Sequence, residues 1–126
     1  MINTPSTPKP GETTTLWLIK LLTGPILLVI AFIHVIVNHY IGSLAGLLSH
    51  AEVVAYYQSW YIPVMEGIFL VTVISHCLIG FRGIILDLKP NPGLLRVLDW
   101  IFILGGAGFV IYGLWLLNAV AQMGAA

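Results

Sequence analysis

One apolar stretch of the sequence carries three ionisable side chains. Within VISHCLIGFRGIILDLKP, residues 73–90, His76 is followed by Arg82 six residues later and by Asp87 five residues after that. An ionisable group inside a membrane-grade segment is costly, so it indicates a functional site. Neutral imidazole binds haem iron well, and haem is apolar enough to lie between membrane helices. His76 is therefore a candidate haem ligand, and the alternative is a histidine that hydrogen-bonds a neighbouring helix.

The residues that follow His76 suit such a site. Gly80 lies four residues on, on the same helix face, where the missing side chain leaves room for a flat macrocycle or a close helix. Arg82 could pair with a haem propionate, because a guanidinium fork suits a carboxylate, or it could extend to lipid headgroups. For Asp87 the simplest interpretation is an ordinary carboxylate at the membrane interface.

The other three histidines precede this stretch. At about 1.5 Å of rise per helical residue, His34 lies in the outer half of the first apolar segment, His39 lies near its outer end, and His50 lies in the loop that follows. Glu66 lies about one turn into the second apolar segment from the outer side. It could relay protons or bind quinone, but we favour a hydrated carboxylate at the interface.

The composition points to lipid as the solvent. Of the 126 residues, 59% are hydrophobic and 8% are charged, whereas about a quarter of the residues in a soluble domain are charged. A soluble chain this short could not hide so much apolar surface. The formal net charge of zero gives no indication of a nucleic-acid partner. The single cysteine, Cys77, excludes an internal disulfide, and we expect it to serve packing on a different helix face from His76.

The apolar residues form three long runs, at 16–41, 61–86 and 97–121. Each exceeds the ~20 residues that a helix needs to cross about 30 Å of hydrocarbon, and helix is the only open-chain structure that satisfies its backbone there. We therefore predict an all-α membrane protein with three transmembrane helices in a single domain, residues 16–126. Buried helices of a soluble bundle are the alternative.

Polar segments flank these runs. Residues 1–15 are rich in proline and threonine and are predicted to form a flexible arm. SHAEVVAYYQSW, residues 49–60, is predicted to contain a short interfacial helix, and KPNPG, residues 89–93, interrupts the helical pattern. The glycines of GGAG, residues 105–108, lie inside an apolar helix, where small residues serve packing.

The basic residues predict an orientation. With three spans, the N-terminal arm and the 87–96 loop lie on one side of the membrane. All five basic residues fall on or near that side: Lys9, Lys20, Arg82, Lys89 and Arg96. The positive-inside rule then places the N-terminus in the cytoplasm, in a multi-pass protein of the cell inner membrane.

The spacing in the second run resembles a known family. The pattern His76-x-x-x-Gly80-x-Arg82-x-x-x-x-Asp87 is similar to the second transmembrane helix of the membrane-anchor subunits of succinate dehydrogenase (succinate:quinone oxidoreductase). FIHVIVNHY, residues 32–40, and LLTGPILL, residues 21–28, look like first-span segments of its SdhD-like cytochrome b anchor subunit. The resemblance covers roughly residues 20–90.

This resemblance implies a role for each histidine. The chain would form half of a haem-binding anchor bundle, with His76 as one axial ligand of haem b and the other ligand supplied by a second membrane-anchor cytochrome b subunit. Members with two haems also use a first-span histidine, for which His34 is the candidate and His39 the alternative. One haem or two therefore remain open. The other implied partners are an iron–sulfur subunit and a flavoprotein subunit.

The chain departs from the family pattern at three positions. Leu21 replaces an arginine of the first span, with Lys20 beside it, and Thr23 stands where serine is common. Leu88 replaces a tyrosine that contacts quinone in some members. Quinone contacts from this chain are then reduced to Asp87 and Arg82, with the remaining contacts coming from partner subunits.

The function implied is that of a non-catalytic anchor that supports electron transfer from succinate to quinone, in the respiratory chain and the tricarboxylic acid cycle. The sequence contains no dinucleotide fingerprint and no cysteine cluster for iron–sulfur ligation. The alternatives are a quinol:fumarate reductase anchor, a haem-free structural subunit of a membrane complex, and a small cytochrome acting alone. The last needs both haem ligands on one chain, and the different depths of His34 and His76 argue against it.

Overall fold

The computed structural model describes residues 8–41 and 49–123, and within these ranges its regular secondary structure is all helix. Its elements are α1 (Thr14–Ile36), η1 (Val37–Ile41), α2 (His50–Tyr57), α3 (Tyr61–Asp87) and α4 (Pro92–Met123). Three segments are long and apolar enough to span a membrane: Thr14–Tyr40, Tyr61–Asp87 and Pro92–Met123. The predicted all-α class with three transmembrane helices is confirmed.

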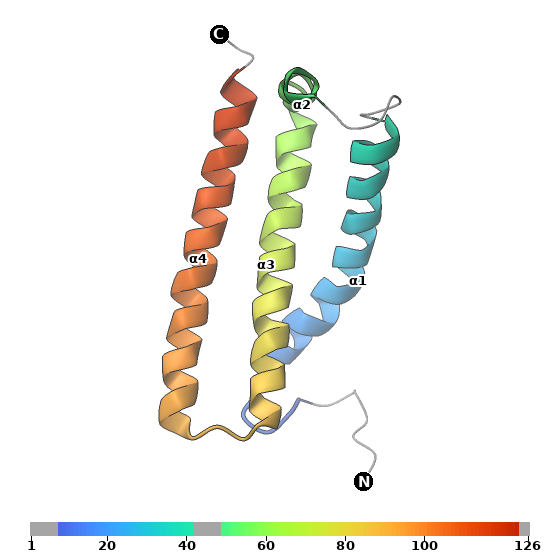
Figure 1. Ribbon diagram of the computed structural model, residues 1–126. Coiled ribbons are helices and arrows are strands. Elements are labelled where there is room, and N and C mark those ends of the chain that lie inside the picture. Colours follow the sequence, from blue (N-terminus) through green and yellow to red (C-terminus); the bar gives the residue numbers. More distant parts are fainter. Residues whose placement is uncertain (1–7, 42–48, 124–126) are drawn as a thin grey trace.

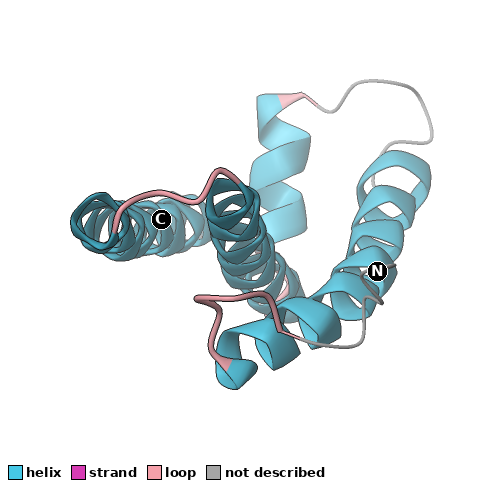
Figure 2. Ribbon diagram, turned by 90° about the horizontal axis from the view of Figure 1, so that it is seen from below, coloured by secondary structure: helices cyan, strands magenta, loops and turns pink. Residues whose placement is uncertain are grey.

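The helix α3 lies between the other two long helices (Figures 1 and 2). It packs against α1 on one side and against α4 on the other, whereas α1 and α4 do not pack on each other over the described residues. The N-terminal segment and the α3–α4 connection lie at one end, and α2 and the end of α4 lie at the other (Figure 1). This is the arrangement predicted for three successive spans.

The third span starts earlier than predicted, at Pro92 instead of residue 97. The Asn91 side chain accepts a hydrogen bond from the Leu94 backbone N–H at 2.7 Å and so caps the helix. Proline is well suited to the first helical position, because its missing N–H has no partner there in any helix. The connection between α3 and α4 is therefore short. Lys89, whose φ of 51° is in the left-handed region, lies where the chain reverses direction.

The first span also starts early, at Thr14, inside the segment predicted as an arm. The Thr13 hydroxyl accepts a hydrogen bond from the Leu16 N–H at 3.3 Å. The helix is bent along its length (Figure 1), and Pro25 accounts for the bend because it lacks a backbone donor and its ring crowds the preceding turn.

The short helix predicted in residues 49–60 is confirmed as α2. Ser49 and Glu52 form a capping box: the Ser49 backbone N–H donates to the Glu52 carboxylate at 2.6 Å, and the Ser49 hydroxyl accepts from the Glu52 N–H at 3.4 Å. The bond from the Ser49 N–H lowers the pKa of Glu52. After α2, the Gln58 side chain donates to the Ala121 carbonyl at 3.2 Å and joins this connection to α4.

Glycines let α3 and α4 pack closely. A Cβ atom on Gly106 would lie 2.5 Å from Cδ1 of Leu78, and one on Gly113 would collide with Leu70. The packing role predicted for the glycine-rich segment is therefore confirmed at Gly106. Around Gly105 and Gly108, no described atom would come within 4 Å of an added Cβ.

Very little of the chain is buried within itself. Among the described residues, Ile62 is the only large hydrophobic side chain that is fully buried, whereas Leu28 is 73% exposed and Phe109 is 69% exposed. Apolar surface on this scale must be covered by lipid or by partner subunits.

Candidate functional site

The predicted haem ligand His76 lies where α1 crosses α3. Its ring atom Nδ1 is 2.9 Å from the hydroxyl oxygen of Thr23. That hydroxyl is also 2.7 Å from the carbonyl oxygen of Ile19, one turn earlier in α1. A Cβ on Gly24 would lie 3.6 Å from Cε1 of His76, so the glycine lets α1 approach the imidazole. His76 thus has a defined polar neighbour on a second helix.

The position beside Gly80 is open in this chain. No described atom lies within 4 Å of the position that its Cβ would occupy. The next glycine, Gly83, is covered instead, because an added Cβ there would lie 3.6 Å from the Lys20 amine. The helix surface beside Gly80, one turn after His76, is therefore not covered by described atoms. At Gly83 the Lys20 amine covers it.

Arg82 forms an ion pair with a residue of α4. Its Nε donates to Oδ1 of Asp99 at 2.6 Å and its Nη2 donates to Oδ2 at 3.1 Å, a bidentate fork. Its Nη1 donates to the Gly11 carbonyl at 3.4 Å. Arg82 therefore joins α3, α4 and the N-terminal segment.

A pocket of about 580 Å³ lies beside this ion pair, between α3, α4 and the start of α1. Its lining is mainly apolar, with Leu78, Phe102 and Val110 among the wall residues, and the Arg82–Asp99 pair supplies its polar part. The combination suits an amphiphilic molecule with a compact polar group.

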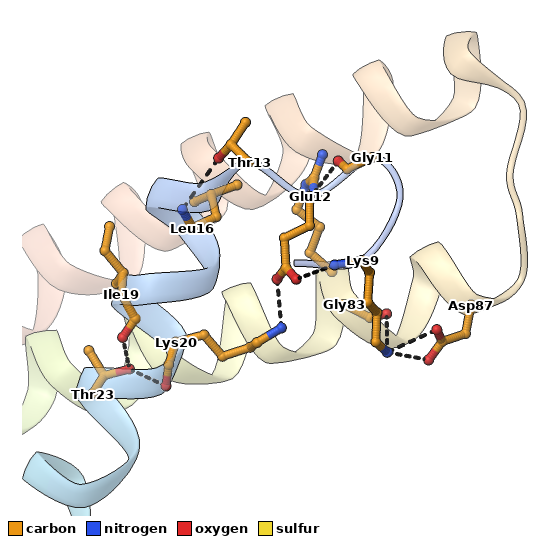
Figure 3. A network of polar contacts seen from close by, with 11 residues as sticks. Lys9, Gly11, Glu12, Thr13, Leu16, Ile19, Lys20, Thr23, Gly83 and Asp87 are labelled. Carbon is orange, nitrogen blue, oxygen red and sulfur yellow. Dashed lines mark hydrogen bonds and ion pairs between the residues drawn. The ribbon is translucent and has the colours of Figure 1, made fainter. Parts of the chain in front are cut away.

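The N-terminal segment is joined to the same end of the bundle (Figure 3). The Lys9 amine donates to both carboxylate oxygens of Asp87, at 2.9 and 2.6 Å, and contacts the Gly83 carbonyl at 3.4 Å. Asp87, the predicted quinone contact, therefore has a cationic partner on its own chain. Both side chains remain partly exposed, so the pair contributes little to stability, about 0–1 kcal/mol.

The ion pair between Lys20 and Glu12 lies next to the one between Lys9 and Asp87 (Figure 3). The Lys20 amine, on α1, donates to Glu12 at 2.6 Å, and the Lys9 backbone N–H donates to the same carboxylate at 3.3 Å. Burial by itself raises the pKa of Glu12, but these bonds and the two lysine charges outweigh it, and the pKa lies below its ordinary value of 4.5. Residues 9–13 are therefore held against α1 and α3, while residues 1–7 of the predicted arm lie outside the described residues.

A separate polar cluster lies in the outer half of the bundle. The Nδ1 atom of His34 is 3.0 and 2.9 Å from the two carboxylate oxygens of Glu66, and the Asn38 amide donates to Glu66 at 3.0 Å. The ring of Phe69 stacks on His34 with 4.7 Å between centroids. With only 8% of its surface exposed, Glu66 is buried, so the preferred interpretation of a hydrated interfacial carboxylate is wrong. The side chains of His34, on α1, and Asn38, on η1, lie one turn apart and supply the polar partners of Glu66 instead.

The charge of Glu66 also affects Tyr56 on α2. The hydroxyl oxygen of Tyr56 is buried and has no hydrogen-bond partner in the described part of the chain. Burial, followed by the charge of Glu66, raises its pKa to about 12. Tyr56 therefore stays protonated and keeps a free donor near the outer end of the bundle.

The remaining candidate residues lie on the surface. His39 and His50 are exposed, and so is Cys77, which does not pack inside this chain. The sequence interpretation missed the partners Thr23, Asn38, Glu12 and Asp99. Only the Asn38 contact had a usable signal, because a spacing of four residues places it on the same helix face as His34.

Comparison with known protein families matches residues 6–104 to one family, described as "Succinate dehydrogenase/Fumarate reductase transmembrane subunit". The match includes α1, α2, α3 and the first part of α4, and therefore both polar clusters. No curated protein and no solved structure matches the chain.

Proposed function

The chain belongs to the succinate dehydrogenase/fumarate reductase transmembrane subunit family, and we propose that it is the anchor subunit of a succinate dehydrogenase. In this role it binds haem b together with a second anchor subunit and supports electron transfer from succinate to quinone. The observation that carries the proposal is the position of His76, an intramembrane imidazole held through one nitrogen at a helix crossing.

The residues around His76 fit a haem. Its Nδ1 is engaged by Thr23, while Nε2 has no hydrogen-bond partner among the described residues. Gly80, one turn away, leaves the adjoining surface open. When bound, haem b supplies a one-electron carrier, and the contribution of this chain is to supply one axial nitrogen and an apolar wall.

Arg82 and Asp87 have more restricted roles in this proposal. Asp99 occupies the Nε edge of the Arg82 guanidinium, so a haem propionate would be left the Nη1 side, where the contact with the Gly11 carbonyl is long at 3.4 Å. A quinone near Asp87 would similarly meet a carboxylate already paired with Lys9. We therefore propose that Arg82 lies beside the quinone or propionate in the assembled complex and keeps Asp99 as its main partner.

His34 is the proposed ligand of a second haem. A carboxylate bound to one ring nitrogen of a histidine commonly orients the other nitrogen toward a metal, and Glu66 occupies that position at Nδ1. The Nε2 atom has only a long contact of 3.5 Å, with Asn38. His39 is the alternative ligand, and it is exposed on η1.

The proposed setting follows from the family and from the charge distribution. The chain would lie in the cell inner membrane with its N-terminus in the cytoplasm. There it would assemble with a second cytochrome b anchor, an iron–sulfur subunit and a flavoprotein. Membership of such a complex follows from the family, which includes fumarate reductases as well. The sequence does not separate the two directions, because direction depends on reduction potentials and quinone type, and a quinol:fumarate reductase anchor is the alternative.

The test is a haem determination on the purified complex. We expect a b-type band in the reduced-minus-oxidised spectrum, and His76→Ala should abolish the haem that this residue binds. His50→Ala is the matched control, because His50 is exposed in α2. If the second haem exists, His34→Ala removes half of the haem per complex and leaves the His76-bound half. A complex without haem would leave the haem-free structural alternative.

A further inference from the structure

The hydroxyl group of Thr23 has a single proton, and it donates this proton to a backbone carbonyl of α1. The oxygen lies 2.7 Å from the Ile19 carbonyl and 3.3 Å from the Lys20 carbonyl, and both of these groups only accept hydrogen bonds. Threonine in a helix commonly donates to the carbonyl one turn earlier in this way. The Thr23 oxygen can therefore act only as an acceptor toward its other close neighbour, the His76 ring.

With the Thr23 proton used inside α1, the ring proton of His76 is assigned to Nδ1. A neutral imidazole has one N–H and one lone pair. Because Nδ1 lies 2.9 Å from an oxygen that has no proton to give, Nδ1 must be the donor. The lone pair is then on Nε2, the ring nitrogen that no described residue engages.

We propose that Thr23 is a positioning residue for haem binding by His76. By accepting the Nδ1 proton it holds the ring in the tautomer and orientation that present Nε2 to iron. The hydrogen bond also makes the imidazole a stronger electron donor, which favours ferric iron. This inference rests on the proposed function, because it presumes that His76 is the ligand.

The test uses the midpoint potential of the haem in the purified, intact complex, with the haem-to-protein ratio as a second readout. Thr23→Ser keeps the hydroxyl and should match the parent in both. Thr23→Val removes the acceptor and should shift the potential upward, since the ferric state loses stabilisation. Thr72→Val is the matched control: the Thr72 hydroxyl makes the same bond to a carbonyl one turn earlier, 2.7 Å from Ile68 O, on α3. Its potential should equal that of the parent.

Each outcome decides the inference. Equal potentials in Thr23→Val, Thr23→Ser and the parent overturn it. If Thr23→Val does not assemble, Thr23→Ala removes the hydroxyl without added bulk. Failure of both to assemble, while Thr23→Ser assembles, assigns the hydroxyl to helix packing alone and also overturns it. Haem retained at full occupancy in His76→Ala instead contradicts the proposed function, whatever Thr23 does.

Discussion

At the scale of single residues, Glu66 shows how a carboxylate is accommodated deep in an apolar bundle. It is bound by the His34 ring of α1 at 2.9 Å and by the Asn38 amide of η1 at 3.0 Å. A buried polar group without such partners would cost several kcal/mol, on the order of 2–7. The cluster therefore also joins the first span to α3 in the half of the bundle nearer α2.

The Glu66 cluster leads to a stability prediction. Glu66→Ala leaves His34 and Asn38 without their shared acceptor, and we expect a loss of about 1–3 kcal/mol in the stability of the complex. Glu66→Gln keeps an acceptor oxygen and should lose less. Thermal denaturation of the purified complex in detergent measures both. Equal midpoints for the parent and Glu66→Ala would show that the cluster contributes nothing to stability.

At this scale the sequence predicted the position of a residue along its helix. It did not predict which side chains of other elements that residue contacts. The intramembrane position of His76 followed from counting residues along a helix, and the structure places it in α3. The contact with Thr23 could not be predicted, because it depends on where the bent helix α1 crosses α3. For the same reason Glu66 was expected to meet water, although it meets one side chain of α1 and one of η1.

At the scale of elements, the glycines of α4 predict a difference between its faces. Gly106→Ala forces Leu78 to move, and we expect it to destabilise the complex by about 1–3 kcal/mol, as overpacking does. Gly108→Ala is the control in the same helix, because its added Cβ meets no described atom. Thermal denaturation compares the two variants. If both lose the same stability, the α3–α4 contact is not what requires glycine in this segment.

The N-terminal segment predicts a dependence on pH. The pKa of Glu12 is below 4.5 in the folded chain, so its ion pair with Lys20 stabilises the fold above about pH 4.5. That contribution is lost as the pH falls through the lowered pKa. Hydrogen exchange of residues 8–14, corrected for intrinsic rates, should therefore accelerate at acid pH.

The control for this prediction is Glu12→Gln, which should show fast exchange in the same residues at neutral pH. Slow exchange in that variant would mean that the ion pair does not hold the segment.

The helical spans could be predicted because length and hydropathy suffice for a segment that lipid surrounds. Their starts could not be predicted as well. The start of α4 depends on an asparagine cap and a first-turn proline, and we interpreted KPNPG only as an interruption. The start of α1 depends on a threonine cap that also lay inside a polar segment.

At the scale of the whole molecule, most of the apolar surface lies outside the helix contacts of this chain. Its central helix α3 is flanked by one helix on each side, and only one large hydrophobic side chain is fully buried in the described residues. Lipid and partner subunits are the candidates for covering the rest. Membership of a multisubunit membrane complex, which the family match indicates, supplies the missing surface.

The topology predicts the side of the membrane on which each end lies. A C-terminal fusion to alkaline phosphatase, which is active only after export, should be active, and the corresponding fusion to green fluorescent protein should be dark. Fusions made in the α3–α4 connection should give the reverse pattern. Fluorescence from the C-terminal fusion would place the basic end outside and contradict the orientation.

The most direct test of the central claim is an electron cryo-microscopy structure of the intact complex. The account predicts that Nε2 of His76 binds the iron of a haem shared with the second anchor subunit, while Nδ1 keeps its bond to Thr23. A His76 ring that contacts only protein, with no macrocycle between the two anchor chains, would contradict it.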